Sequence, residues 1–209
     1  LLRGEPLTSR LVRRGKLGVA ETLEALVPVM DALAFAHARG IVHRDVKPDN
    51  VFLATDAKGH TTSKLLDFGI AKVLDDGSGA RGGADTRTGT VIGTLQYMAP
   101  EQLAGRAVDQ RADIYSFGVI LYEMATGRLP FDGGSSAEKM ASILRDEPRP
   151  VEQLRPDLPA ALAQVLHRCL ARDPEKRFAT ARALATELAA LKRSADLDEL
   201  VASGSLPSR

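Results

Sequence analysis

The length of 209 residues fits one ordinary domain or one large lobe of a bigger protein. Lysine and arginine total 28 against 27 acidic residues, so the formal charge of +1 supplies no long-range field for nucleic acid or an anionic membrane. The single cysteine, Cys169, rules out an internal disulfide and is typical of a reducing compartment; we interpret it as a buried structural thiol.

The first predicted helix runs from Ala20 to Arg39. Apolar residues recur there at spacings of three and four, which indicates a helix with one buried face. Gly40 follows as a C-terminal stop. Pro28 removes a backbone donor inside this pattern, at a cost of about 3 kcal/mol in a regular helix. We therefore expect a kink or a late helix start at that residue.

A hairpin and a polar segment follow this helix. The stretches NVFLAT (50–55) and KLLDF (64–68) read as two short strands, joined by a polar turn through residues 56–63. Residues 75–90 are rich in Gly, Asp, Thr and Arg and hold scarcely a large apolar side chain. This composition predicts an exposed, mobile segment.

The remaining chain reads as helical. Residues 113–126 are apolar almost all round, which predicts a helix buried in the middle of the domain. Three further helical patterns occupy residues 137–144, 159–171 and 180–192. The periodicity is lost after them, so we assign residues 1–193 to one domain and residues 194–209 to a tail or the start of a linker.

Three polar motifs stand between these elements in a fixed order. They are HRDVKPDN (43–50, the His-Arg-Asp loop), LLDFGIAK (65–72) and GTLQYMAPEQ (93–102). Their order, spacing and context resemble the signature set of protein kinases, closest to bacterial serine/threonine kinases of the eukaryotic-like (Hanks) type. The resemblance covers nearly the whole chain, from about residue 1 to residue 192. It implies an α+β, protein-kinase-like fold with a mainly helical C-terminal lobe and a short β-hairpin.

The resemblance also implies roles for the first two motifs. Phosphoryl transfer requires the protein mainly to position two anionic partners and to neutralise charge. Asp45 would accept or orient the proton of the substrate hydroxyl, and Lys47 would lie near the transferring phosphoryl group. Asn50 and Asp67 would offer oxygen ligands to Mg²⁺, with Mn²⁺ as an alternative. ATP would be the donor, with Phe52 under its adenine ring.

Three residues of these motifs are expected to act structurally. Phe68 and Gly69 would form a hinge, in which glycine permits unusual backbone angles. The ring of Phe68 would pack against His43, which is therefore a structural residue and not a metal ligand. His37, His60 and His167 stand apart from other ligand-type residues, so we do not expect them to bind metal either.

A second structural set lies in the last motif and beyond it. The resemblance pairs Glu101 with Arg177 in a buried salt bridge, which is costly to break. It also assigns Asp113 to holding the backbone of the His-Arg-Asp loop. Because Asp113 opens a predicted helix, an N-terminal capping role is chemically natural as well.

Two residues indicate which hydroxyl groups would accept the phosphate. The DVKPDN form, with Lys47 two residues after the aspartate, resembles serine/threonine kinases rather than tyrosine kinases. Thr94 matches the threonine that contacts the catalytic Asp and Lys in that class. Protein substrates with Ser or Thr acceptors are therefore expected.

The polar segment suggests regulation. Thr86, Thr88 and Thr90 lie there in the run TRTGT. A phosphate on this run would pair with Arg44 and Lys72, ordering the segment and fixing the neighbouring aspartate. The alternative, an unmodified flexible polar loop, remains open.

The 209 residues contain no glycine-rich phosphate loop, strand lysine or helix glutamate of a kinase N-terminal lobe. We therefore expect the larger lobe alone, with little activity by itself and a homodimer as the route to trans-autophosphorylation. A pseudokinase or a lobe-only interaction module is the alternative, which the retained Asp45, Asn50 and Asp67 disfavour. Kinases of sugars or antibiotics are disfavoured by the third motif.

Without a membrane segment or signal peptide pattern, the chain is expected in the cytoplasm, although the full-length protein could be membrane-anchored.

Overall fold

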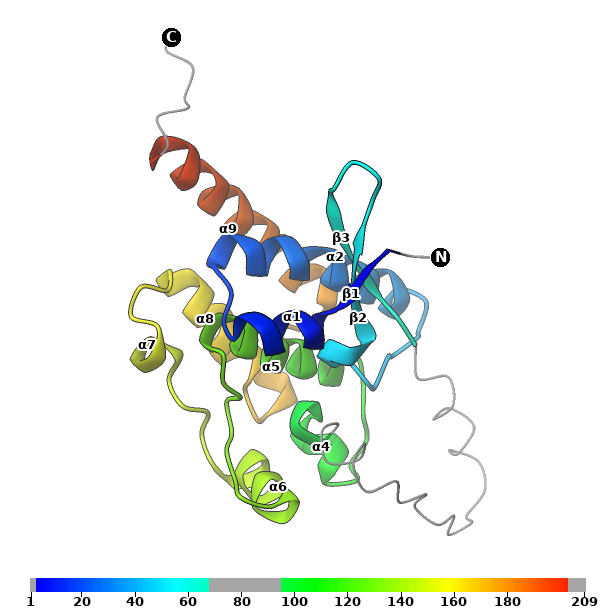
Figure 1. The fold of residues 1–209 in the computed structure, drawn as a ribbon. Helices are drawn as coiled ribbons and strands as arrows, with labels where there is room; N and C mark the ends of the chain where they lie inside the picture. The colour runs from blue at the N-terminus through cyan, green and yellow to red at the C-terminus, as the bar shows by residue number, and fades with distance from the viewer. Residues whose placement is uncertain (1–2, 68–94, 203–209) are drawn as a thin grey trace.

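The computed structural model describes residues 3–67 and 95–202, with only the backbone for residues 196–202. Helices surround a central buried helix, and a small sheet lies at one side (Figure 1). The elements in chain order are β1 (Gly4–Pro6), α1 (Leu7–Arg14), α2 (Val19–His37), η1 (Pro48–Asn50), β2 (Val51–Thr55), β3 (Thr61–Leu65), η3 (Leu95–Tyr97), α4 (Pro100–Leu103), α5 (Arg111–Thr126), α6 (Ser136–Arg145), α7 (Val151–Leu154), α8 (Ala160–Cys169), η4 (Pro174–Lys176) and α9 (Ala181–Ala202).

The sheet has the order β1-β2-β3 with antiparallel neighbours. The hairpin is confirmed, but β3 begins at Thr61, inside the stretch predicted as turn. The reason is the side chain of Asp56, whose Oδ1 accepts the backbone N–H groups of Lys58 at 2.8 Å and His60 at 2.9 Å. This local bonding closes the turn early. The short strand β1 was not predicted, because three residues carry no readable alternation.

Helix α2 runs through Pro28 from a start at Val19, so the predicted late start is wrong. Residues on both sides of the proline, including Leu26 and Met30, are fully buried on one face. Each such side chain stabilises by about 1.5–3 kcal/mol when buried, and together they outweigh the roughly 3 kcal/mol cost of the proline.

Helix α5 is the buried centre of the fold, as its sequence predicts. Thirteen of its residues are buried, among them Asp113. It packs closely on α8: a Cβ atom at Gly118 would stand 2.6 Å from the Cβ of Cys169. Cys169 is fully buried, and burial raises the pKa of its thiol, which confirms its structural assignment.

The helices of the C-terminal half match their predicted positions closely at α6 and α8. Helix α9 packs along α2 and continues to Ala202, so the predicted end near Lys192 is wrong (Figure 1). Helices α1, α4 and α7 were not predicted; α4 and α7 are four residues each, too short for a periodic pattern.

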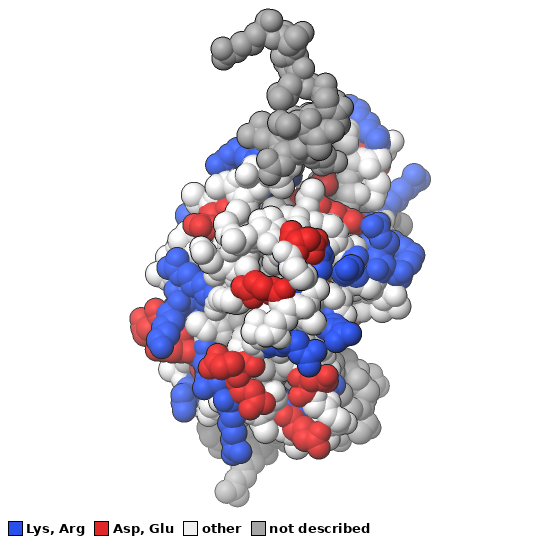
Figure 2. Space-filling view, turned by 90° about the vertical axis from the view of Figure 1, so that its left-hand side faces the viewer, with Lys and Arg blue, Asp and Glu red and all other residues white. Residues whose placement is uncertain are grey.

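On the face in Figure 2, acidic and basic side chains are interspersed, in keeping with the formal charge of +1. Among the described helices, none has the length and apolar character to cross a bilayer.

Candidate active site

The His-Arg-Asp loop is held by one buried carboxylate at the start of α5. Asp113 Oδ2 accepts the backbone N–H of His43, and Oδ1 accepts that of Arg44, both at 2.8 Å. Oδ2 also lies 2.7 Å from Nε2 of His37, a side chain only 3% exposed. Two of the hydrogen bonds of this carboxylate thus hold the backbone of the loop. Because α5 begins at Arg111 and has no side-chain cap, the capping role suggested for Asp113 is wrong.

This anchoring supports an unusual backbone. Arg44 has a φ of 63°, in the left-handed region that residues other than glycine rarely adopt. Such a conformation costs about 1 kcal/mol or more and persists only where surrounding contacts hold it. Besides Asp113, the amide of Gln102 contributes, donating from Nε2 to the Arg44 carbonyl at 3.0 Å.

A closed set of hydrogen bonds, which we call the loop-hairpin ring, joins the His-Arg-Asp loop to the end of the hairpin. His43 Nε2 donates to the carbonyl of Leu66 at 2.9 Å, and its Nδ1 accepts the N–H of Asp45 at 3.3 Å. The N–H of Leu66 donates to the carbonyl of Asn50 at 2.8 Å. Asn50 Nδ2 then donates to the Asp45 carbonyl at 2.8 Å. His43 is fully buried and bonds to backbone through both ring nitrogens.

The carboxylate of Asp45 is fixed by two donors. Its Oδ2 accepts Lys47 Nζ at 3.0 Å and Asn50 Nδ2 at 3.2 Å. The side chains of Asp45 and Lys47 are 25% and 17% exposed, so both reach solvent. The carboxylate is therefore oriented by protein groups and still accessible from solvent.

Asn50 and Asp67 lie at the same end of the hairpin. Strand register pairs Val51 with Leu65, and the Leu66-to-Asn50 hydrogen bond extends the pairing by one residue. Asp67 follows immediately, with a φ of 49°. Because Asn50 Nδ2 bonds to Asp45, its carbonyl Oδ1 is the group left for a cation. An amide oxygen and a carboxylate are the ligand types that Mg²⁺ prefers.

Phe52 lies on β2 opposite Pro6 of β1. Its neighbours Val51 and Leu53 are buried on the inner face of the sheet, whereas Phe52 is half-buried on the other face. Its expected place under an adenine ring remains a prediction.

The expected pair of Glu101 and Arg177 is present and fully enclosed. Arg177 donates from Nη1 and Nη2 to the two carboxylate oxygens of Glu101 at 2.7 and 2.8 Å, and the side chains are 0% and 7% exposed. The guanidinium has five N–H donors, and the other three bond to backbone carbonyls. These carbonyls belong to Ala171, Arg111 and Arg172, at 2.7, 2.9 and 3.1 Å.

Sequence reasoning missed a half-buried polar pair that joins the third motif to α5. Tyr97 donates from its hydroxyl to Glu123 Oε2 at 2.7 Å. Burial raises the pKa of the Glu123 carboxyl, and the nearby Asp49 charge adds to this shift. Burial and the charge of Glu123 likewise raise the pKa of Tyr97, so the phenol stays protonated as the donor. The two residues are 26 positions apart, and no local pattern links them.

His37 was also missed as a site residue. It was interpreted as isolated, yet it bonds to Asp113 across 76 positions. One signal was available: His37 follows Leu33 and Ala34 at helical spacing, so it continues the buried face of α2 immediately before the His-Arg-Asp loop.

Several expected site residues lie outside the part of the chain that the structure describes. They are Phe68, Gly69, Lys72, Thr86, Thr88, Thr90 and Thr94, together with the predicted mobile segment 75–90.

The fold and the site together define a protein-kinase-like lobe, with a catalytic-type loop anchored on a central helix. The family model described as the protein kinase domain matches residues 1–189. The chain belongs to the protein kinase family. The family and fold class predicted from the motifs are thereby confirmed.

Bacterial serine/threonine kinases are similar to the chain. Serine/threonine-protein kinase Pkn1 of Myxococcus xanthus is 47% identical over 173 residues, covering 82% of this chain and 24% of that protein. PknB of Mycobacterium tuberculosis is 39% identical over 175 residues, covering 83% and 26%. The crystal structure of the Mycobacterium tuberculosis PknI kinase domain, a C20A_R136A double mutant, superposes with a TM-score of 0.64 at 30% identity, covering 92% of this chain and 64% of that one. The chain thus spans about a quarter of the length of these curated relatives.

Proposed function

We propose that the chain is the larger lobe of an ATP-dependent kinase that phosphorylates Ser and Thr hydroxyls of proteins. The observation that carries this proposal is the loop-hairpin ring, because it brings Asp45, Asn50 and the residue before Asp67 into one bonded unit. The similarity to kinases named as serine/threonine-specific supports the acceptor class.

Asp45 accepts or orients the proton of the acceptor hydroxyl. Its carboxylate is oriented at Oδ2 by Lys47 and Asn50 and is partly open to solvent, which suits a group that must meet a protein substrate. Lys47, a compact cation beside it, offsets negative charge near the transferred phosphoryl group.

Asn50 and Asp67 hold Mg²⁺, or Mn²⁺ in its place, through one amide oxygen and one carboxylate. When bound, the ion neutralises charge on the triphosphate of ATP. The bonds from Asn50 to Asp45 couple the ligand residue to the acceptor residue, so that both move as one unit.

Phosphorylation of Thr86, Thr88 or Thr90 activates the enzyme by pairing with Arg44 and Lys72. The position of Arg44 supports this idea, since it precedes Asp45 directly and has a left-handed backbone that depends on surrounding contacts. A homodimer is the arrangement in which one copy modifies another.

Residues 1–193 form the kinase lobe, and this stretch alone transfers phosphate poorly, because it has no glycine-rich loop or strand lysine to hold the triphosphate. The retained Asp45, Asn50 and Asp67 favour this reading over a pseudokinase.

The test is transfer of labelled γ-phosphate from ATP to a generic acceptor protein in Mg²⁺, using the longest protein that the gene encodes. Asp45→Asn is expected to slow transfer by about 10²–10⁴-fold. Asp31→Asn, an equal change at a carboxylate that is 55% exposed on α2, is the control and should leave the rate unchanged. Label on phosphotyrosine alone, or equal rates for the two variants, would contradict the proposal.

A further inference from the structure

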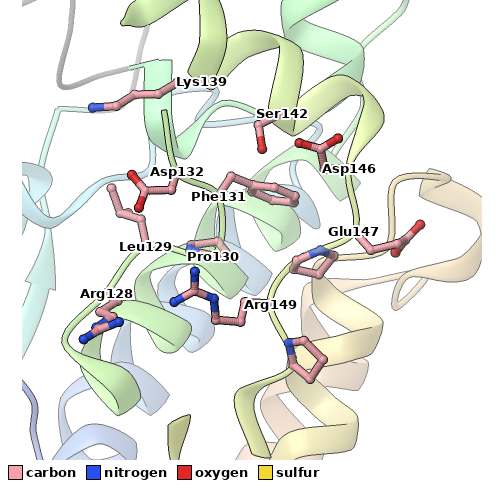
Figure 3. A pocket seen from close by; sticks show the side chains of 12 residues that line it. Arg128, Leu129, Pro130, Phe131, Asp132, Lys139, Ser142, Asp146, Glu147 and Arg149 are labelled. Carbon is pink, nitrogen blue, oxygen red and sulfur yellow. The ribbon is translucent and has the colours of Figure 1, made fainter. Parts of the chain in front are cut away.

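A groove of about 850 Å³ lies between the segment that follows α5 and the segment that follows α6. Its floor is apolar, with Pro130 buried and Phe131 half-buried. Its rim is charged, and Figure 3 shows the guanidinium groups of Arg128 and Arg149 pointing to the same side of the pocket. Of the acidic lining residues, Asp146 and Glu147 lie at the other end, and Asp132 lies on the side of the arginines (Figure 3). Oδ1 of Asp132 accepts the backbone N–H of Gly133 at 2.9 Å. None of these residues belongs to the site described above.

The backbones of the two arginines are held by the last turns of α5. Tyr122 donates from its hydroxyl to the carbonyl of Arg149 at 2.8 Å, and Arg149 N–H donates to Pro130 at 3.3 Å. Thr126 Oγ1 accepts the N–H of Arg128 at 3.1 Å. The hydroxyl proton of Thr126 has two carbonyl acceptors within reach, Tyr122 at 2.8 Å and Arg128 at 3.0 Å. Both arginines line the same groove. The backbones that carry the two exposed cations are therefore held in place.

These cations have no counter-ion within residues 3–67 and 95–195, where side chains are described. Neither Arg128 nor Arg149 forms an ion pair there, and nor does Lys139 on the same rim. Of the acidic residues, Glu147 is engaged by Arg172 at 3.4 Å. Two neighbouring guanidinium groups repel each other, and a carboxylate between them would relieve this repulsion through bidentate bonds.

We propose that this groove docks an acidic segment of the protein substrate. Its carboxylates bind Arg128 and Arg149, while an apolar side chain of the same segment covers Pro130 and Phe131. The identification of the segment as part of a substrate rests on the proposed kinase function.

The length of α5 sets the distance between the groove and the His-Arg-Asp loop. Most of α5 separates Asp113 from Thr126. Asp113 holds the His-Arg-Asp loop, and Thr126 holds Arg128. At about 1.5 Å per residue the distance along the helix is on the order of 20 Å. An extended chain covers this with about six residues. The acidic residues should therefore lie about six or more positions from the acceptor hydroxyl.

The test measures binding without catalysis. The probe is a fluorescein-labelled, glutamate-rich peptide that contains leucine and no Ser, Thr or Tyr; its counterpart carries glutamine at every glutamate. Fluorescence anisotropy with the 209-residue chain at low salt should show tighter binding of the glutamate peptide. Arg128→Glu/Arg149→Glu should weaken it about tenfold or more, and Arg128→Gln/Arg149→Gln by less. Asp146→Asn should leave it unchanged or strengthen it.

The matched control is Lys58→Glu/Arg193→Glu, which makes the same change in net charge on the hairpin turn and on α9. Both residues are exposed and form no ion pair with the described part of the chain. Equal weakening in the control, equal affinity for the two peptides, or no effect of the arginine changes would overturn the proposal. Thermal melts identify any variant that fails to fold. If the charge-reversal variant does not fold, the test uses Arg128→Gln/Arg149→Gln instead.

Failure of this proposal and failure of the kinase proposal are distinguishable. The peptide has no acceptor hydroxyl, so Asp45→Asn should bind it like the unchanged chain. If the enzyme transfers phosphate but does not bind the glutamate peptide, the docking proposal alone is refuted. A chain that binds the peptide while its full-length form shows no transfer refutes the kinase function, and with it the identification of the bound segment as a substrate, but not the binding of acidic segments in the groove.

Discussion

Replacing Glu101 with glutamine should destabilise the fold strongly, because it leaves a buried cation without a counter-ion. In the structure, Arg177 uses two of its five N–H donors on Glu101 and three on carbonyls, with its side chain 0% exposed. Glutamine keeps one acceptor and turns an amide N–H₂ toward the other donor. Breaking such a pair costs about 3–5 kcal/mol, against a total stability of about 5–15 kcal/mol.

Urea denaturation of the 209-residue chain measures this effect. With a slope of about 2–3 kcal/mol per molar urea, Glu101→Gln should lower the midpoint by about 1–2.5 M. A second variant, Glu101→Leu/Arg177→Met, removes both charges and should recover most of the loss, since buried ion pairs are often replaceable by apolar groups. A single change that costs under about 1 kcal/mol, or a double change no more stable than the single, would refute the reasoning.

Three further predictions follow from individual contacts. Gly118→Ala should destabilise the chain by about 1–3 kcal/mol in the same urea assay, because the new methyl group would stand 2.6 Å from Cys169 Cβ. His37→Leu should speed hydrogen exchange at the amides of the His-Arg-Asp loop that Asp113 holds, and His37→Gln, which keeps a donor, should restore part of the protection. Arg13, followed by Arg10, lowers the pKa of Glu5 to about 2, so Glu5 stabilises the fold above its ordinary pKa of 4.5. That contribution should fade as pH falls from 4.5 toward 2, most visibly at low salt, and Glu5→Gln should abolish this part of the pH dependence.

The sequence predicts what is local. The apolar run of α5 and the polar motifs lie in continuous stretches, so the central helix, the hairpin and the family could be predicted from them. The course of α2 through Pro28 could not, because the burial that compensates for the proline comes from packing against other elements.

The same difference between local and distant contacts decides which residues of the candidate site could be predicted. Motif residues such as Asp45 and Asn50 are recognisable because their bonds to each other span only a few positions. The contacts of His37 with Asp113 and of Tyr97 with Glu123 span 76 and 26 positions. Neither pair shares a motif or a helix, so only the fold reveals them.

All of these distant contacts converge on α5. Asp113 near its start holds the His-Arg-Asp loop, Glu123 in its later part binds Tyr97, and Thr126 at its end holds Arg128 of the proposed docking groove. A helix buried on nearly every side cannot rotate or shift without disturbing the core, since protein interiors are close-packed. The spacing between the proposed acceptor site and the proposed docking groove is therefore set by one rigid element. A change in the middle of α5, such as Gly118→Ala, should disturb both sites together, whereas changes at either end should affect one.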